Sequence, residues 1–427
     1  MAGRLRLGTL GTQDAHITGS PTYSHFLNIF KNHTNFAFDV REQPLLEPRF
    51  DNETMCIIPV DMGDLLTNLT LRYQFSYKAS VSSDSSSGGN YDDPFTPNVG
   101  IHAIEYADLY IGGTIIERLT GDWIYMYHKY HTSDYNFRDN VVPLTTAKEE
   151  PYGSSGEDNT WNLRQMYIDL PFYFYNNLPA SILLCKLTKQ NCYVRIKFRS
   201  RDKIVRPYLN QYTTELKIKT ASLLTTYAYL DTDELNYLKS TPMDQLITQM
   251  QLRRYDIQRT DDPKQEIALG FKHPVKTLYF IAGKKSREFP YHDSEETLIQ
   301  YMLNTKFKNL SIILNNTTLF DESFSKLVYE NSLTNSMSGI DSDVSFDSEG
   351  TLPTRDHIAS YSFAMFPLEN APSGHLNFSR IIDQRCQIEL DYTDPYSAGE
   401  GEITEVQIYA KNYNILHYSS GLCGLKY

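Results

Sequence analysis

Apolar and polar residues alternate along many short segments of this chain. In residues 69–78 every odd-numbered residue is apolar or aromatic and every even-numbered residue is polar. The same period of two runs through residues 194–199, 215–219 and 406–410. This period is typical of a β-strand with one buried face. Because such segments occur in both halves of the 427-residue chain, we predict an all-β protein.

The strongest helical signal lies near the middle of the chain. Asp231 can cap a helix, and Glu234, three residues later, can reach back in a capping-box arrangement. We therefore predict a short helical connector between two β-rich halves, residues 1–229 and 230–427. Each half is long enough for one β-sandwich with its own core.

Two further local signals follow from turn and cap residues. Thr241 is followed by Pro242 and predicts a second short helix over residues 244–250. Gly112 and Gly113 can adopt the positive φ angles of a tight turn, so the surrounding segment is expected to form a β-hairpin.

Long polar segments separate several of the predicted strands. They lie at residues 80–98, 143–159 and 335–350 and are rich in Ser, Asp, Gly or Asn. Such segments cannot build a core and belong on a surface. Long loops between strands are more typical of jelly rolls than of barrels built from tight hairpins.

The composition narrows the class of partner. Lys and Arg number 40 against 52 Asp and Glu, so the net charge is -12 and a broad nucleic-acid-binding surface is not expected. The 32 Tyr and 21 Phe indicate either many strands and large contact surfaces or a biased base composition.

The five Cys are odd in number and lack zinc-site spacing, so we expect reduced thiols. The first residues lack the apolar run of a signal peptide.

No motif in the sequence predicts a catalytic, cofactor or metal site. Residues 283–286 resemble part of a phosphate-binding loop, but the upstream glycine is missing. Residues 341–347 resemble the start of a calcium loop without its glycine and final glutamate. His128 and His131 are not expected to converge on one metal in a strand or loop. We therefore expect a protein that is not an enzyme and has no cofactor.

Many short sequence motifs in this chain resemble those of the major capsid proteins of nucleocytoplasmic large DNA viruses, of the iridovirus, phycodnavirus and mimivirus type. The strongest stretch runs from Ala103 to Trp123 and includes an Ile-Gly-Gly and a Gly-Asp-Trp string. The strings follow the family's order from about residue 11 to the C-terminus. One departure is Tyr173, where the family usually has Trp. The signature residues are Gly11, Asp14, Gly19, Pro21, Asn35, Phe36, Glu105, Gly112, Gly113, Gly121, Asp122, Trp123, Pro171, Phe172, Asp231, Asp233, Glu234, His273, Pro274, Asn377, Phe378, Ser379, Arg380, Asn412, Tyr413, Asn414, Gly421 and Gly424.

The resemblance implies a fold and a function. It implies two consecutive eight-stranded jelly-roll β-sandwiches, three chains in a homotrimeric capsomer of nearly hexagonal outline, and a lattice of such trimers in an icosahedral capsid. It also implies minor capsid and penton proteins as partners, only indirect contact with an inner membrane, no direct nucleic-acid binding, and assembly in the host cytoplasm.

By the same analogy the long polar segments form outer towers, and the N-terminal segment with Arg4 and Arg6 lies at the inner face or against a neighbour. Turns are expected at Gly11, Gly19, Gly112, Gly113 and Gly121. Asp14, Asp122 and Asp231 are expected to cap local backbone, and Trp123 is expected in the core.

Two other functions remain open on the sequence. A poxvirus-type membrane scaffold protein uses the same double jelly roll. A glycan-binding or glycan-cleaving β-sandwich belongs to a different class and predicts an aromatic groove with paired carboxylates.

Overall fold

The computed structural model describes residues 20–21, 24–26, 32–79, 99–131, 161–204, 213–258, 264–285, 305–323, 326–327, 340–341, 357–392 and 403–427. Residues 37–427 form one compact unit and residues 1–36 form a separate one. Two of the segments predicted as surface loops, 80–98 and 143–159, lie outside the described residues, as does most of 335–350.

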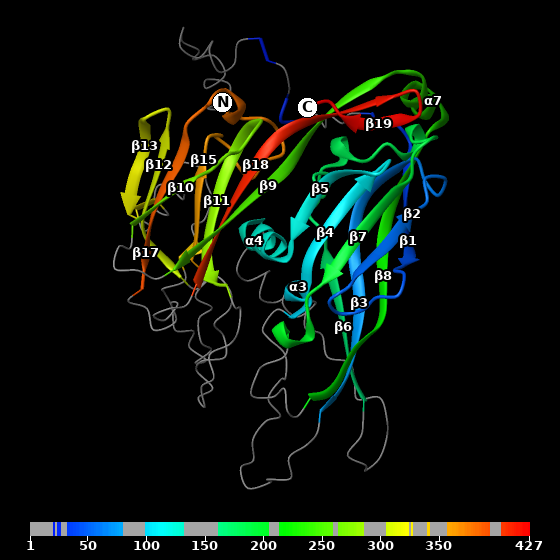
Figure 1. The fold of residues 1–427 in the computed structure, drawn as a ribbon. Coiled ribbons are helices and arrows are strands. Elements are labelled where there is room, and N and C mark those ends of the chain that lie inside the picture. Colours follow the sequence, from blue (N-terminus) through cyan, green and yellow to red (C-terminus); the bar gives the residue numbers. More distant parts are fainter. Residues whose placement is uncertain are drawn as a thin grey trace, which may run out of the picture. The chain divides into compact units, whose positions relative to one another are not determined.

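The first half is a sandwich of two four-stranded sheets, coloured blue to green in Figure 1. One sheet has the order β1-β8-β3-β6, and the other has the order β2-β7-β4-β5. Wherever the register is described, paired strands are antiparallel. Eight strands that cross between two sheets in this way form a jelly roll. The strands are β1 (Phe36–Pro44), β2 (Glu53–Ile58), β3 (Leu65–Ala79), β4 (Ile104–Ile111), β5 (Thr114–Thr120), β6 (Trp161–Asp169), β7 (Cys192–Phe198) and β8 (Thr213–Leu230).

The second half repeats this order. Its larger sheet contains β9-β18-β11-β15, and its smaller sheet has the order β10-β17-β12-β13. The short strands β14, β16 and β19 extend the larger sheet. The prediction of two consecutive jelly rolls is confirmed. The strands are β9 (Met243–Gln258), β10 (Lys264–Ala268), β11 (Pro274–Lys284), β12 (Lys306–Leu314), β13 (Thr317–Ser323), β14 (Ile340–Asp341), β15 (His357–Ser362), β16 (Leu376–Asn377), β17 (Gln384–Asp391), β18 (Ile403–Ser419) and β19 (Leu422–Leu425).

The predicted connector helix is present as α7 (Thr232–Ser240). Asp231 caps it by accepting a hydrogen bond from the backbone N–H of Thr232. The predicted capping box is not formed, because no hydrogen bond joins the backbone N–H of Asp231 to Glu234 among the described residues, and Glu234 Oε2 has no partner there.

The prediction of a second helix over residues 244–250 is wrong. This segment belongs to β9, whose sixteen residues pair with β18 from Met243 opposite Tyr418 to Gln258 opposite Ile403. The long ladder satisfies the backbone of both strands, and this tertiary pairing overrides the local helical signal.

A helix that the sequence did not predict, α4 (Gly121–His131), follows β5. It carries Trp, Tyr and His, which are weak helix formers and common in strands, so its sequence does not stand out as helical. In the part of the chain that the structure describes, the other short helices are α3 (Val99–His102), η2 (Leu178–Ala180), η3 (Leu184–Lys186), η4 (Arg201–Lys203) and η7 (Phe378–Arg380).

The larger sheet of the second half is buried on both faces. Leu278 and Phe280 of β11 point into the core of their own sandwich. Tyr279 and Ile281 of the same strand belong to the core cluster of the first half. The first core therefore continues through the junction, and the two jelly rolls pack as one body.

Candidate functional site at the junction of the two jelly rolls

Helix α4 lies between the two sandwiches (Figure 1) and places aromatic rings against the second half. The centroid of the Trp123 ring lies 5.0 Å from that of Tyr279 and 5.8 Å from that of Tyr409. Tyr130, two turns further along, lies 5.5 Å from Tyr279. Tilted and edge-on rings at these distances add to the stabilisation from burial alone.

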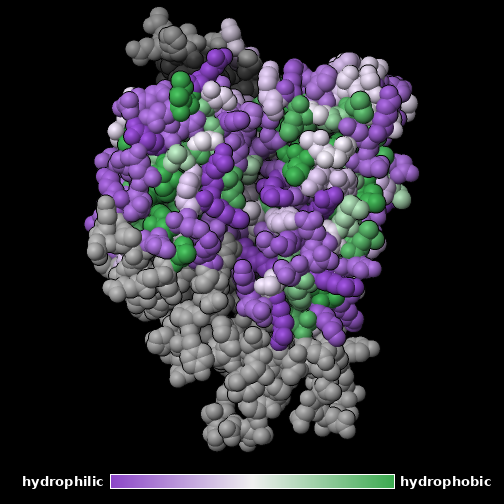
Figure 2. Space-filling view, viewed as in Figure 1, coloured by the Kyte–Doolittle hydropathy of each residue, from purple (hydrophilic) through white to green (hydrophobic). Residues whose placement is uncertain are grey.

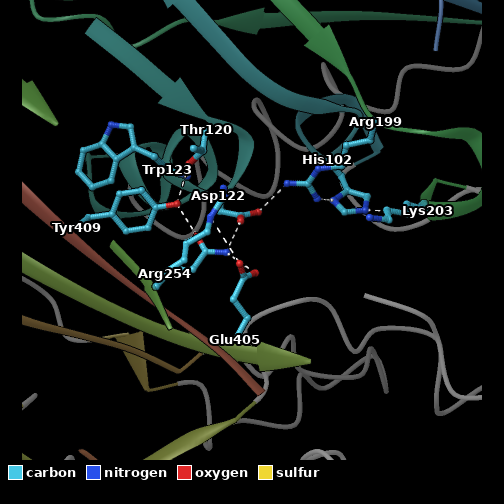
Figure 3. A network of polar contacts seen from close by, with 10 residues as sticks. His102, Thr120, Asp122, Trp123, Arg199, Lys203, Arg254, Glu405 and Tyr409 are labelled. Atoms are coloured by element: carbon cyan, nitrogen blue, oxygen red, sulfur yellow. Dashed lines mark hydrogen bonds and ion pairs between the residues drawn. The ribbon is translucent and has the colours of Figure 1, made fainter. Parts of the chain in front are cut away.

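A relay of hydrogen bonds runs beside these rings and crosses the junction (Figure 3). The backbone N–H of Trp123 donates to Thr120 Oγ1 at 3.2 Å, and Thr120 Oγ1 lies 2.7 Å from the Tyr409 hydroxyl. The Tyr409 hydroxyl donates to Gln407 Oε1 at 2.7 Å. Thr120 must therefore donate to Tyr409, which fixes the direction of every bond in the relay.

Gln407 connects the carboxylates of the two halves. Its Nε2 donates to Asp122 Oδ2 of the first half and to Glu405 Oε2 of the second half, both at 3.1 Å. Arg254 lies on β9, and its Nε is 3.5 Å from Glu405 Oε1. Both amide hydrogens and the amide oxygen of Gln407 are thus used, as a buried polar side chain requires.

The centre of the network is a buried ion pair. Arg199 Nη2 lies 3.0 Å from Asp122 Oδ1, and the two side chains are only 4% and 1% exposed. Arg199 Nη1 also donates to His102 Nδ1 at 2.8 Å, and His102 Nε2 lies 3.0 Å from the carbonyl oxygen of Lys203. Because a carbonyl only accepts, His102 is protonated at Nε2 and accepts at Nδ1. Asp122 is therefore held by both halves, beyond the local cap expected of it.

A second pair of buried ionisable groups lies near the network. Glu117 Oε2 accepts a hydrogen bond from the backbone N–H of Tyr173 at 2.8 Å. Burial raises the pKa of Glu117 to about 8, although this bond and the charge of Lys411 act in the opposite direction. Burial lowers the pKa of Lys411, while the charge of Glu117 raises it. Both line one small cavity with Tyr127, whose ring centroid is 5.9 Å from Lys411 Nζ. Burial therefore favours the uncharged forms of both Glu117 and Lys411 at the junction.

Several signature residues gather at this junction. Asp122 and Trp123 belong to the network, and Pro171 and Phe172 line the cavity beside Glu117. Gly121 begins α4, where an added Cβ would meet the Ile104 carbonyl oxygen at 2.2 Å. Only glycine permits this close approach of two backbone segments.

A larger group of signature residues meets in a groove of the second half. These residues come from the start of β11, from η7 and from the middle of β18, which are far apart in the sequence. They are His273, Pro274, Asn377, Ser379, Arg380, Tyr413 and Asn414. The buried Phe378 and Asn412 are their chain neighbours.

The remaining signature residues are dispersed. Gly112 and Gly113, at φ 59° and 85°, form the turn of the predicted hairpin between β4 and β5, and Gly421 has φ 84°. Pro21, Asn35 and Phe36 belong to the separate N-terminal unit. Glu105 pairs with Lys197, Gly424 lies in β19, and Asp231, Asp233 and Glu234 lie at the start of α7. Outside the described residues are Gly11, Asp14 and Gly19.

Sequence reasoning missed several residues of the junction, above all His102, Arg199 and Gln407. The alternation in residues 406–410 puts Gln407 and Tyr409 on the face opposite Val406, Ile408 and Ala410, but both faces of this strand are buried. The alternation was the one signal in the sequence, and it was not sufficient, because it does not tell whether a second domain covers the polar face of the strand.

The described residues also bear on metal binding, membrane insertion and thiol chemistry. Among the described residues no group of three or more His, Cys, Asp or Glu could hold a metal ion. No helix in that part of the chain is long and apolar enough to cross a membrane. His128 and His131 lie on α4, where each ring lies within hydrogen-bonding distance of a backbone carbonyl, of Asp169 and Tyr127 respectively. The five cysteines are free thiols.

Comparison with known proteins gives one consistent result. The profile of the "Major capsid protein N-terminus" matches residues 24–231, and that of the "Large eukaryotic DNA virus major capsid protein" matches residues 234–424. The chain is 25% identical to the major capsid protein of Pyramimonas orientalis virus over 441 residues, which cover 100% of this chain and 99% of that protein. It is 24% identical to that of Paramecium bursaria Chlorella virus 1, with full coverage of both chains.

The fold is similar to that of PBCV-1 VP54, with a TM-score of 0.72 and 21% identity over 95% of this chain and 100% of that chain. Neither a poxvirus-type scaffold nor a glycan-active protein gains support from these matches. The two profiles, the relatives matched along their full length and the paired jelly rolls show that the chain belongs to the family of major capsid proteins of large eukaryotic DNA viruses.

Proposed function

We propose that this chain is the subunit of an icosahedral shell and acts as a homotrimeric capsomer, with a structural and not a catalytic role. The observation that carries the proposal is the fusion of two jelly rolls of equal strand order through a buried, hydrogen-bonded junction. Three such chains around a threefold axis present six similar sandwiches, and a nearly hexagonal ring of this kind can tile a flat lattice.

The proposal divides the chain into two domains, one for each jelly roll. We place the boundary between residues 229 and 230, immediately before the cap of α7. In this proposal the signature residues act through geometry, because they form turns, the junction and the groove. A shell protein needs fixed contact surfaces, and a rigid junction keeps the two sandwiches of each chain in register.

Partners and location are part of the proposal. Trimers would contact one another, minor capsid proteins and penton proteins, and would meet an inner membrane only indirectly. The net charge of -12 supports a shell without direct nucleic-acid contact. Virions would carry the finished shell, and assembly would take place in the host cytoplasm.

The described surface offers one candidate for contact between copies. Figure 2 shows a mostly hydrophilic face with separate hydrophobic patches. On the edge strand β1, the alternate residues Phe38 and Val40 are 49% and 58% exposed. Exposed apolar side chains on a strand edge favour association with another chain.

The experiment is the solution mass of the purified chain by size exclusion with light scattering. Three copies of the 49.3 kDa chain give about 148 kDa for a closed trimer. Val40→Glu should shift this mass towards the monomer, whereas Tyr237→Glu, on the exposed face of α7, should leave it unchanged. A folded wild-type monomer at micromolar concentration would contradict the capsomer.

A further inference from the structure

Seven of the ten residues that line a groove of about 490 Å³ in the second half are signature residues. They reach it from three separate segments, which contribute His273, Asn377 and Tyr413 among others. The Arg199 network and the Glu117 cavity share no residue with this groove. A volume of this size is in the range of ligand sites in proteins.

Hydrogen bonds connect two of the segments that line the groove. The backbone N–H of His273 donates to Ser379 Oγ at 2.8 Å, and its carbonyl oxygen accepts from the Phe378 N–H at 3.1 Å. Asn377 Oδ1 accepts from the Ser379 N–H at 3.0 Å. His273 itself has a φ of 66°, a left-handed conformation that is strained for a residue with a side chain. Strain that the surroundings enforce in this way is most common at functional sites.

The chemistry of the groove is apolar with a positive group. Leu246, Pro274 and Ile415 contribute apolar surface, and Leu246 is 46% exposed. Arg380 is exposed and has no ion pair with a described residue, and no Asp or Glu lines the groove. The main-chain carboxyl group of Tyr427 also lines the groove, and its oxygen accepts a hydrogen bond from Asn414 Nδ2 at 3.0 Å. The guanidinium of Arg380 has no such partner among the described residues, so an apolar trough beside this cation is complementary to an apolar segment that carries a negative charge.

We propose that this groove binds an extended peptide segment of a second protein, in which a carboxylate side chain lies close to an apolar anchor. The apolar anchor packs on Leu246 and Pro274, and the carboxylate pairs with Arg380, whose planar guanidinium suits it. The N-terminal residues 1–10 of this chain are the wrong occupant, because they contain Arg4 and Arg6 and no acidic residue. The proposal goes beyond self-assembly and does not depend on the trimer.

The test selects peptides without assuming a sequence. A phage-displayed library of random 12-residue peptides is selected on the wild-type protein, and the best peptide is made with a fluorophore for anisotropy titration. Enriched peptides should carry Asp or Glu near an aromatic or aliphatic residue. Arg380→Glu should weaken the selected peptide about tenfold or more, because a charged hydrogen bond is lost and a repulsion is added.

Matched variants separate the groove from the general surface charge. Arg49→Glu reverses an exposed arginine of the first half and should leave the affinity unchanged. A peptide in which Lys replaces the acidic residue should bind the Arg380→Glu variant more tightly than it binds the wild-type protein. Leu246→Ser, at an exposed apolar position, should also weaken binding. The unfolding temperature of each variant is measured alongside, since all three positions are exposed and should tolerate the change.

Three results would overturn the proposal. One is no enrichment of acidic and apolar peptides on the wild-type protein. Another is equal binding of the selected peptide by wild type and Arg380→Glu. The third is a change in oligomeric mass in Arg380→Glu, which would place a second copy of this chain in the groove. The mass of the wild-type protein tests the capsomer separately, so the two proposals can fail independently.

Discussion

Replacing Arg199 by Met should destabilise the junction more than any change to a surface ion pair. Arg199 and Asp122 are almost fully buried and lie 3.0 Å apart. Arg199→Met keeps a long apolar stem but removes the guanidinium, so the buried carboxylate of Asp122 loses this countercharge and His102 Nδ1 loses its donor. An uncompensated buried charge is among the most destabilising changes a protein can undergo.

The magnitude follows from the burial. Breaking a buried ion pair by removing one partner costs about 3–5 kcal/mol. For a sandwich of this size, each 1 kcal/mol lowers the unfolding temperature by about 2–4 °C, so the expected decrease is about 6–20 °C. Replacing both partners, in Arg199→Met with Asp122→Leu, removes the unpaired charge and should recover much of this loss.

The assay is differential scanning calorimetry at fixed protein concentration and neutral pH. Fixed concentration matters because the unfolding temperature of an oligomer depends on it. Arg49→Met is the matched control, since Arg49 and Glu47 form a pair that is 71% and 83% exposed. An exposed pair of this kind contributes about 0–1 kcal/mol, so the control should differ little from wild type.

The double-variant cycle decides whether the reasoning is correct. If Arg199→Met unfolds within 2 °C of wild type, or about as the Arg49→Met control does, the buried pair does not stabilise the junction. If the double variant loses the full sum of the two single losses, the two side chains are not coupled. Either outcome would show that the Arg199–Asp122 pair does not hold the junction together.

Three further predictions concern other parts of the chain. Because burial raises the folded-state pKa of Glu117 to about 8 from 4.5, wild type should lose stability as the pH rises between these values, and Glu117→Gln should reduce that loss in calorimetric scans from pH 5 to 8. Gly121→Ala should destabilise by about 1–3 kcal/mol because its Cβ would clash with the Ile104 carbonyl oxygen, and Gly113→Ala should lose about 1–2 kcal/mol from its positive φ alone, since the space around it is open. In denaturant titrations, a loss near zero for Gly121→Ala would contradict the close approach of the two backbone segments. Cys185, the one thiol that is not buried, should react first with a thiol reagent in the native protein, and faster labelling of any other cysteine, mapped by mass spectrometry, would count against the described packing.

The sequence was sufficient for the strands because their period is local. Residues 69–78, 194–199, 215–219 and 406–410 all lie in strands or extend them by one residue. The hairpin turn at Gly112 and Gly113 was predictable for the same reason, since a positive φ angle is a property of two residues.

The sequence failed where a distant segment decided the outcome. Residues 244–250 carry a helical cap and apolar spacing, yet they form β9 because β18, more than 150 positions away, offers a full ladder of partners. Helix α4 is the reverse, because its sequence has no clear helical signal and yet it forms a helix. Its aromatic side chains pack against Tyr279 and Tyr409 of the second half.

By itself the sequence determined the all-β class, the two halves, the connector helix and the family resemblance. Each depends on residue order, on a short period or on a cap that acts within one turn. The tertiary structure alone decided which polar side chains are buried. Gln407 stands on the polar face of its strand, and only the packing of the first half against that face makes it a bridge between Asp122 and Glu405. Burial depends on what covers a surface, and no local pattern contains that information.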